Sequence, residues 1–246
     1  MNKSSSVEQT RLLNNKKYRE WYKQEILPKN YNPVVHLGVN IGLLAGSLLF
    51  HFIMIKDWSP IFLALMALIF FLGNVVVFVL HKYPLHRRYK WWTFPYDTHT
   101  VEHHRYFTAE TITFDNSMDF NAVFFPMEVI AGFTLIGQPL IFFGVKHFFG
   151  QDVAHVITGS AASYFLLYEF FHWASHLPRN HFLMKFPWIL YMRQHHVAHH
   201  NPRLMNRYNF CIVDPLVDII MGTKYKGDLP QDVIEDHYQD VKSNLR

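Results

Sequence analysis

Four long runs of apolar residues dominate the pattern of the chain. Residues 34–55 and 61–80 are broken by only a few polar side chains, whereas 122–145 contains Pro126 and Pro139, which predict a bend or break, and 153–171 is the most polar run. A helix needs about 20 mostly apolar residues to cross a bilayer, so the pattern predicts about four transmembrane helices. A buried helical core in a soluble protein is disfavoured, because two adjacent runs of this length are unusual there.

The placement of lysine and arginine predicts the topology. These residues gather before the first run, between the second and third runs, and after the fourth run. The other two connections carry one each, Lys56 and Lys146. By the positive-inside rule, both termini and the middle loop face the cytosol, which gives two hairpins. A bacterial inner membrane and an endoplasmic reticulum membrane fit this pattern equally well.

The remaining segments divide the chain into three parts. Residues 1–33 form an N-terminal cytosolic or interfacial segment, with an amphipathic helix expected over 5–26. Residues 34–225 form the transmembrane domain, in which 181–192 is too short to span and is expected to be interfacial. Residues 226–246 form a polar tail. The fold class predicted is an all-α integral membrane protein with a cytosolic, histidine-rich helical cap.

Composition narrows the chemistry. Half of the residues are hydrophobic, 17% are aromatic, and there are 17 histidines and one cysteine. The single Cys211 excludes an intramolecular disulfide and a cysteine-based zinc ribbon. The net charge of +4 gives no indication of nucleic-acid binding. The N-terminus is polar, so no cleavable signal peptide is expected.

Four clusters of histidine lie at the predicted cytosolic ends of the runs: HKYPLH, HTVEHH, HWASH and HHVAHH. Residues four apart share a helical face, and neutral imidazole ligates iron, zinc and copper. His99 is therefore expected to pair with His103, and His196 with both His199 and His200, while Pro84 is expected to end the helix between the first two ligands. Ten imidazoles are too many for one ion and suit two. The ten predicted ligands are His81, His86, His99, His103, His104, His172, His176, His196, His199 and His200.

Other polar residues receive supporting roles. A metal-bound histidine usually donates its second N–H to an acceptor, which fixes the tautomer. The candidates for an outer layer of this kind are His195, Asp97, Glu102, Glu169, Asp214 and Asp218. Among the remaining histidines, His36 and His51 are expected to pack or hydrogen-bond within the first run, and His147 and His155 are expected to be solvated.

The order of the histidine boxes resembles the membrane fatty acid hydroxylase superfamily, which includes fatty acid 2-hydroxylases, sterol C-4 and C-5 oxidases and carotenoid hydroxylases. The segment NRYNFCIVDPLVDIIMGT at 206–223 also resembles the stretch that follows the last box there. The resemblance covers roughly residues 35–225. The first box is most similar to the 2-hydroxylase branch. The second box differs, because three residues separate its first histidine from its histidine pair, where many 2-hydroxylases have two.

The resemblance implies a dinuclear iron oxygenase, with the ten histidines as ligands and molecular oxygen as co-substrate. It implies hydroxylation of a membrane lipid, most of all a fatty acyl chain, that reaches the site past aromatic side chains such as Phe78, Tyr168, Phe170 and Phe171. The His-Pro-Gly-Gly signature of a fused haem domain is absent, so a separate electron-donor protein is expected. Imidazole-only sites also accept zinc readily, so purified material can carry zinc.

Three alternatives stay open. The same site could desaturate a lipid or sterol, and box spacing separates the two reactions poorly. A non-catalytic metal transporter or sensor would need a polar path through the bilayer, for which the runs offer few residues. A zinc hydrolase is disfavoured, because such sites usually keep three protein ligands and an open position.

Overall fold

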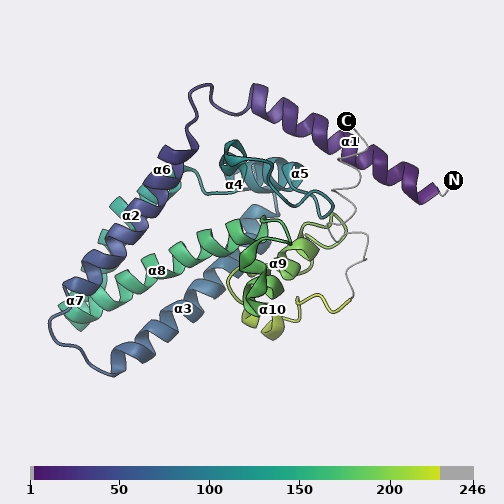
Figure 1. Ribbon diagram of the computed structural model, residues 1–246. Helices are drawn as coiled ribbons and strands as arrows, with labels where there is room; N and C mark the ends of the chain where they lie inside the picture. The colour runs from purple at the N-terminus through teal and green to yellow at the C-terminus, as the bar shows by residue number, and fades with distance from the viewer. Residues whose placement is uncertain (1–2, 228–246) are drawn as a thin grey trace.

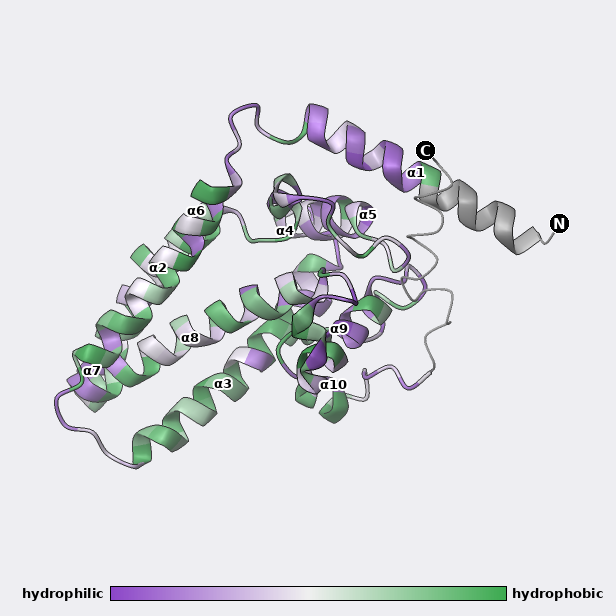
Figure 2. Ribbon diagram, in the orientation of Figure 1, coloured by the Kyte–Doolittle hydropathy of each residue, from purple (hydrophilic) through white to green (hydrophobic). Residues whose placement is uncertain are grey.

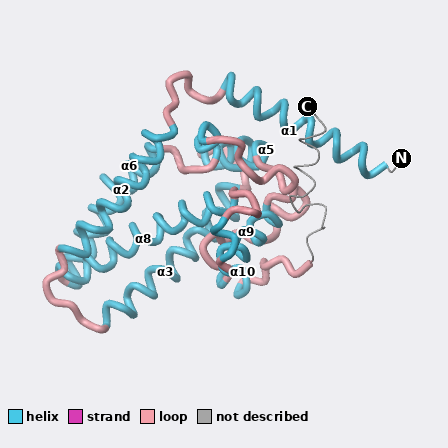
Figure 3. Tube along the Cα trace, viewed as in Figure 1, coloured by secondary structure: helices cyan, strands magenta, loops and turns pink. Residues whose placement is uncertain are grey.

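Long helices project from one end of a cap that is built from short helices and loops (Figure 1). The computed structural model describes the backbone of residues 3–227 and the side chains of residues 13–227. Within that part of the chain every regular element is a helix, as Figure 3 shows. The all-α prediction is therefore confirmed. From residue 228 on, the predicted polar tail 226–246 lies outside the described residues.

The helices follow one another with short connections. The helices of the cap, together with the N-terminal helix α1 (Lys3–Glu25), are α4 (Phe94–Tyr96), η2 (Asp97–His103), α5 (His104–Tyr106), η3 (Ser117–Ala122), η5 (Phe182–Lys185), α9 (Pro187–His199) and α10 (Leu216–Ile220). Those of the long bundle are α2 (Pro33–Ile53), α3 (Ile61–Leu80), η1 (His81–Leu85), α6 (Met127–Gly132), η4 (Phe133–Gly137), α7 (Gln138–Phe149) and α8 (Gln151–Ser175).

Three helices are long and apolar enough to cross a membrane: Pro33–Ile53, Ile61–Leu85 and Met127–Phe149. The Asn32 side chain accepts hydrogen bonds from the first amides of α2, as an N-cap does. The last of these three helices, Met127–Phe149, begins only after Pro126, five residues later than the apolar run predicts. The segment before it supplies contacts to the cap instead. Figure 2 shows α3 as mainly hydrophobic, whereas the described part of α1 is largely hydrophilic.

The fourth predicted span, 153–171, corresponds to α8, which is not among the three. α8 lies between α2, α3 and α7 and contacts all of them. Its buried residues include His155, Ser160 and Glu169. A helix that is surrounded by other helices does not need an apolar surface all round. This burial explains the modest hydropathy of α8 and why the structure has three such helices and not four.

Polar side chains of α2 contact both the segment before α6 and α8. The imidazole of His36 and the amide of Asn40 contact the carbonyl oxygen of Phe125 at 2.8 and 2.9 Å. At the other end of the bundle the Nδ1 atoms of His51 and His155 lie 3.0 Å apart. His155 is therefore buried, and the expectation that it is solvated was wrong, because α2 and α7 cover it.

The segment 181–192, expected at the interface, folds as η5 and the first part of α9. Met184 is buried in a cluster with Ala174 and Leu177, whereas Phe182 and Trp188 are exposed. The segment thus rests on the end of α8 and leads the chain into the last histidine box.

Candidate metal centre

The ten predicted ligands converge inside the cap, at the inner ends of α3 and α8. All are buried, none with more than 7% of its surface exposed. Their ring nitrogens form two groups, in each of which the possible ligand atoms lie within 4.8 Å of one another. One group contains His81, His86, His99, His104 and His199, and the other contains His103, His172, His176 and His196. The tenth, His200, contacts His103 and His196 through Nε2 at 3.2 and 2.9 Å.

Two π-helices shape the first group. α3 does not end at Pro84, as expected, but continues as a π-helix over His81–Leu85. A second π-helix covers Asp97–His103. Because a π-helix closes i→i+5, residues five apart come onto one face, and such turns are frequent at functional sites. This brings His81 together with His86, and His99 together with His104.

The grouping differs from the predicted helical pairs in two places. His99 and His103 were expected to chelate together but fall into different groups, because η2 is a π-helix. His199 was expected beside His196 but joins the first group. His172 and His176, four apart, do share a group as their spacing predicts. The second and last boxes therefore each supply both groups and hold them side by side.

Backbone carbonyls fix the orientation of half of the rings. A carbonyl oxygen can only accept a hydrogen bond, so a ring nitrogen beside it carries the proton. Five rings donate Nδ1–H in this way, over 2.5 to 2.9 Å: His81 to Phe210, His103 to Ala122, His176 to Ile112, His199 to Tyr208 and His200 to Phe107. Each of these five rings, when neutral, presents the lone pair of Nε2 to the centre.

His86 reaches the same state through a hydroxyl. The Thr100 hydroxyl donates its proton to the carbonyl of Leu85 at 2.6 Å. Its oxygen can therefore accept from Nδ1 of His86, which lies 3.3 Å away. The Nε2 lone pair of His86 then faces that of His199 at 2.9 Å. The sequence analysis gave Thr100 no role.

These contacts place one acceptor beside another, an arrangement in which the two lone pairs could share a cation. Nε2 of His103 and Nε2 of His200 are 3.2 Å apart, and both rings have already used their single proton. An extra proton is opposed by burial, which lowers the pKa of His103 to about 4 and holds the pKa of His200 well below its ordinary value. At neutral pH two such lone pairs could therefore ligate a metal ion.

The donor set therefore fits a metal pair. Ten buried imidazoles, with no carboxylate or thiol in either described group, suit iron, zinc or copper and do not suit calcium or magnesium. Nδ1 of His104 and Nδ1 of His196 have no protein partner, so these two rings are not held in one tautomer by the protein.

The loop 208–213 holds two of the rings, and Asp218 holds the loop. The Asp218 carboxylate accepts from the amides of Phe210 and Cys211 at 3.0 and 2.8 Å and from Nε2 of His195 at 3.1 Å. Burial alone would raise the pKa of Asp218, but these hydrogen bonds and one from Thr223 outweigh it and keep the pKa at about 2. His195 and Asp218, both predicted as outer partners of the ligands, thus contact each other. They position the carbonyls that orient the ligand rings and not the rings themselves.

Asn209 lies between Tyr208 and Phe210, whose carbonyls accept from the rings, and has a φ of 59°. This left-handed conformation, which asparagine tolerates better than most residues, turns the carbonyls of Tyr208 and Phe210 toward two different histidines. The Asn209 side chain locks the turn by donating to the carbonyl of His195 at 2.9 Å and accepting from the amide of Tyr225 at 2.7 Å.

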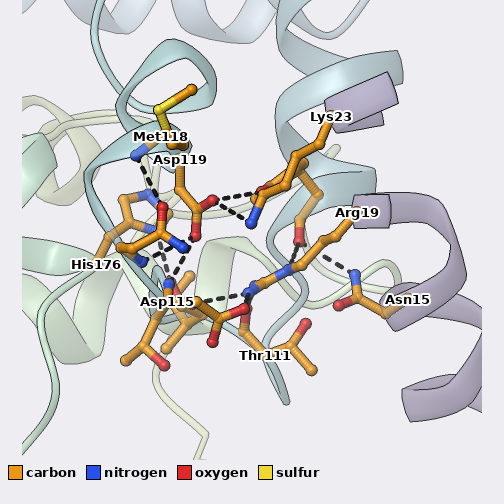
Figure 4. A network of polar contacts seen from close by, with 12 residues as sticks. Asn15, Arg19, Lys23, Thr111, Asp115, Met118, Asp119 and His176 are labelled. Atoms are coloured by element: carbon orange, nitrogen blue, oxygen red, sulfur yellow. Dashed lines mark hydrogen bonds and ion pairs between the residues drawn. The ribbon is translucent and has the colours of Figure 1, made fainter. Parts of the chain in front are cut away.

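A second loop, which provides the carbonyls of Phe107 and Ile112, is fastened to α1 (Figure 4). The buried guanidinium of Arg19 donates to the carbonyls of Tyr106 and Thr113 at 2.8 and 3.1 Å, and also to that of Thr111. Asp119 accepts from the Tyr106 hydroxyl at 2.7 Å and pairs with Lys23 at 2.7 Å. These contacts between α1 and the loop were not predicted from the sequence, because the sequence of α1 indicates only a helix. A weak signal was the Asn116–Asp119 spacing, which is a capping box.

The other four outer candidates do not hydrogen-bond to a histidine ring in the described structure. Asp97 pairs with the exposed Arg88 at 3.5 Å, and Glu102 is half-buried beside a small cavity. Asp214 accepts from Asn74 at 2.9 Å. Glu169 accepts from the amide of Phe125 at 3.3 Å.

An almost wholly apolar cavity of about 520 Å³ leads to the centre through the helix bundle. It runs along α3 from Ile69 to His81, with α8 as its floor and the α6–η4–α7 helix opposite. Of the four aromatic residues expected to line a lipid path, Tyr168 does so, whereas Phe78 packs against Phe210 and Phe170 packs near Trp173. A second cavity of about 120 Å³ reaches His99, His103 and His172 from the side of Glu102 and Asn121.

No known protein family, no curated protein and no solved structure matches the chain. The site is a buried histidine-only centre that could hold metal ions, inside a cap on apolar helices of membrane-spanning length.

Proposed function

We propose that the protein is a membrane-bound di-iron oxygenase that hydroxylates a lipid chain, as the enzymes that its histidine boxes resemble do. The observation that carries the proposal is the meeting of two features: a ten-histidine centre and an apolar cavity that His81 helps to line. A binding protein for metal would have no use for the cavity. A lipid carrier would have no use for the centre.

Each part of the chain has a defined role in this reaction. The ten histidines would hold two iron ions, and iron bound there supplies the activation of dioxygen. The carbonyls of Phe107, Ala122 and Phe210 keep the Nε2 atoms turned inward, so the rings are oriented before a metal arrives. The cavity walls exclude water from the chain and present one of its C–H bonds below His81.

The balanced reaction is R–H + O₂ + 2 e⁻ + 2 H⁺ → R–OH + H₂O. The electrons would come from a separate protein that docks on the outer face of the cap. Four exposed basic residues that follow histidine boxes in the sequence, Arg87, Arg88, Lys90 and Arg207, would contribute to its docking surface. The smaller cavity has room for a few molecules the size of water, and would admit dioxygen and protons without crossing the lipid path.

The membrane arrangement follows the charge pattern. We infer that α8 crosses the bilayer inside the bundle as the fourth span, so that both termini and the metal centre face the cytosol. The exposed Trp91 and Trp92 would then lie at headgroup level, and Trp92 helps to line the apolar cavity.

Desaturation is the second candidate, because the same cavity would present two neighbouring C–H bonds as readily as one. A metal transporter is disfavoured by the burial of all ten histidines at one end of the bundle. The far end has one histidine pair, His51 and His155, which is two ligands and not a chain of sites.

The test compares lipids from a host that expresses the wild type with those from a host that expresses His196→Ala, both grown under heavy-isotope oxygen with an electron donor present. A lipid with one heavy oxygen, seen only with the wild type, is the expected product. An unlabelled lipid two hydrogens lighter would identify a desaturase. Identical lipid spectra from the two hosts would overturn both oxidative functions.

A further inference from the structure

One wall of the apolar cavity is a tyrosine that rests directly on a glycine. Tyr164 of α8 and Gly73 of α3 both line the cavity. A Cβ atom on Gly73 would lie 2.6 Å from Cγ and from Cδ1 of the Tyr164 ring and 2.9 Å from Cδ2. No real side chain tolerates such distances, so the ring occupies the place that any other residue at position 73 would fill.

The ring is also tied at its far end. The Tyr164 hydroxyl donates to Oδ1 of Asn74 at 3.1 Å, and Nδ2 of Asn74 donates to the carbonyl and the carboxylate of Asp214. Asn74 is fully buried in an otherwise apolar helix. This polar pair keeps the ring flat against α3 instead of across the cavity.

The contact lies at a fixed depth below the metal centre. Gly73 precedes His81 by eight residues on α3, and Tyr164 precedes His172 by eight residues on α8. Eight residues of helix correspond to about 12 Å. The cavity continues past this level to Ile69 and Ala161, so the Tyr164 ring stands beside the path and not at its end.

We propose that Tyr164, seated on Gly73, sets the width of the cavity two helical turns below the metal centre and thereby selects the length of lipid chain that the protein accepts. The inference rests on the proposed function only in taking the cavity as the place of a lipid chain. With the ring against α3, a straight chain passes to the lower part of the cavity. With the ring displaced, the chain must end at that level.

Two substitutions should act in opposite directions. In Gly73→Ala the new methyl group meets Cγ, which is bonded to the tyrosine Cβ and cannot slide away. The whole side chain must therefore turn, and the open side is the cavity. In Tyr164→Ala the ring is gone and the cavity widens. The double variant should behave as Tyr164→Ala, because without the ring the methyl group has nothing to displace.

Matched controls are available. Gly144→Ala makes the same change in α7, where an added Cβ meets nothing within 4 Å. Tyr164→Phe keeps the ring but removes its bond to Asn74, so it separates ring volume from hydrogen bonding.

The experiment is native mass spectrometry of the purified proteins after incubation with a graded series of straight-chain fatty acids. Relative to wild type and Gly144→Ala, Gly73→Ala should favour shorter chains and Tyr164→Ala longer ones, each by several-fold in relative occupancy. Equal profiles for all variants, or shifts of both in one direction, would overturn the proposal. Absence of bound chains from every form would overturn it too. The expected shifts without any oxidised product would count against the oxygenase and not against this selection.

Discussion

Nε2 of His103 lies 3.2 Å from Nε2 of His200, although each ring donates its other nitrogen's proton to a backbone carbonyl. Two neutral imidazoles held in this way repel each other. A cation bound between the two nitrogens would relieve this repulsion and stabilise the arrangement. The relationship therefore links the folding of the cap to metal binding, and the following predictions test that link.

Removing one ligand from each group should remove different ions. His86 belongs to one group and His172 to the other. We expect His86→Ala and His172→Ala each to lose about half of the bound metal. The substituted group keeps at least three histidines but not its full ligand geometry, whereas the other group is unchanged. Elemental analysis of the purified variants measures this. His147→Ala, an exposed histidine at the other end of α7, is the control, and an equal loss there would discredit the assignment.

Asp218→Asn should weaken metal binding although the residue touches no predicted ligand. The carboxylate holds the amides of Phe210 and Cys211, and an amide side chain can accept at only one of its two ends. A loosened loop should lower affinity about 10–100-fold, as loss of an outer partner usually does. Competition with a chelator gives the affinity. Asp97→Asn, whose partner is an exposed arginine, should leave it unchanged, and if the two variants match, the loop is not what orients the rings.

Arg19→Leu should destabilise the cap. Arg19 is 5% exposed and donates to three carbonyls. Without it the carbonyls of Thr111 and Thr113 would lose this donor, whereas that of Tyr106 would keep Asn15 as a donor. The expected loss is about 2–6 kcal/mol, since each buried carbonyl left without a donor costs about 1–3 kcal/mol. Thermal unfolding in detergent measures it. Arg88→Leu, at an exposed ion pair, should change stability by less than about 1 kcal/mol. A small effect of Arg19→Leu would show that the contacts of α1 do not stabilise the cap.

Acid should destabilise the metal-free protein from near neutral pH downward. Burial lowers the pKa of His103 to about 4 and of His86 to about 2, whereas unfolded histidine titrates near about 6.5. Below that value the unfolded chain binds more protons than the folded chain. The stabilisation is therefore complete above about pH 6.5 and is lost as pH falls toward the folded pKa values. Melting temperatures of chelator-treated protein across this range should fall steadily, and a flat profile would contradict the burial of neutral imidazoles.

Much of the fold and the ligand set was predictable, because both depend on local pattern. Apolar runs of spanning length gave α2 and α3, and the histidine clusters gave all ten residues that meet in the centre. The assignment of ligands to groups was not predictable from helical spacing. A π-helix at His99 and another at His81 change which residues share a face, and nothing in five letters of sequence distinguishes a π-turn from an α-turn.

The layer around the centre was harder still, because it depends on tertiary contacts. Asp218 was a candidate, but Arg19, Thr100 and Asn209 were not. Their roles come from main-chain carbonyls that lie far away in sequence, as with Arg19 and Thr113. The hydropathy of α8 also misleads, since a helix enclosed by others can carry Glu169 and His155 where a lipid-facing helix could not.

The most direct test is X-ray absorption at the iron edge, with elemental analysis, on wild-type protein loaded with iron. Two ions per chain, surrounded by nitrogen or oxygen atoms with the outer scattering of imidazole and no sulfur, is the predicted result. A folded protein that holds one ion or none, or one whose iron lacks the imidazole signature, would contradict a two-metal centre built by these ten histidines.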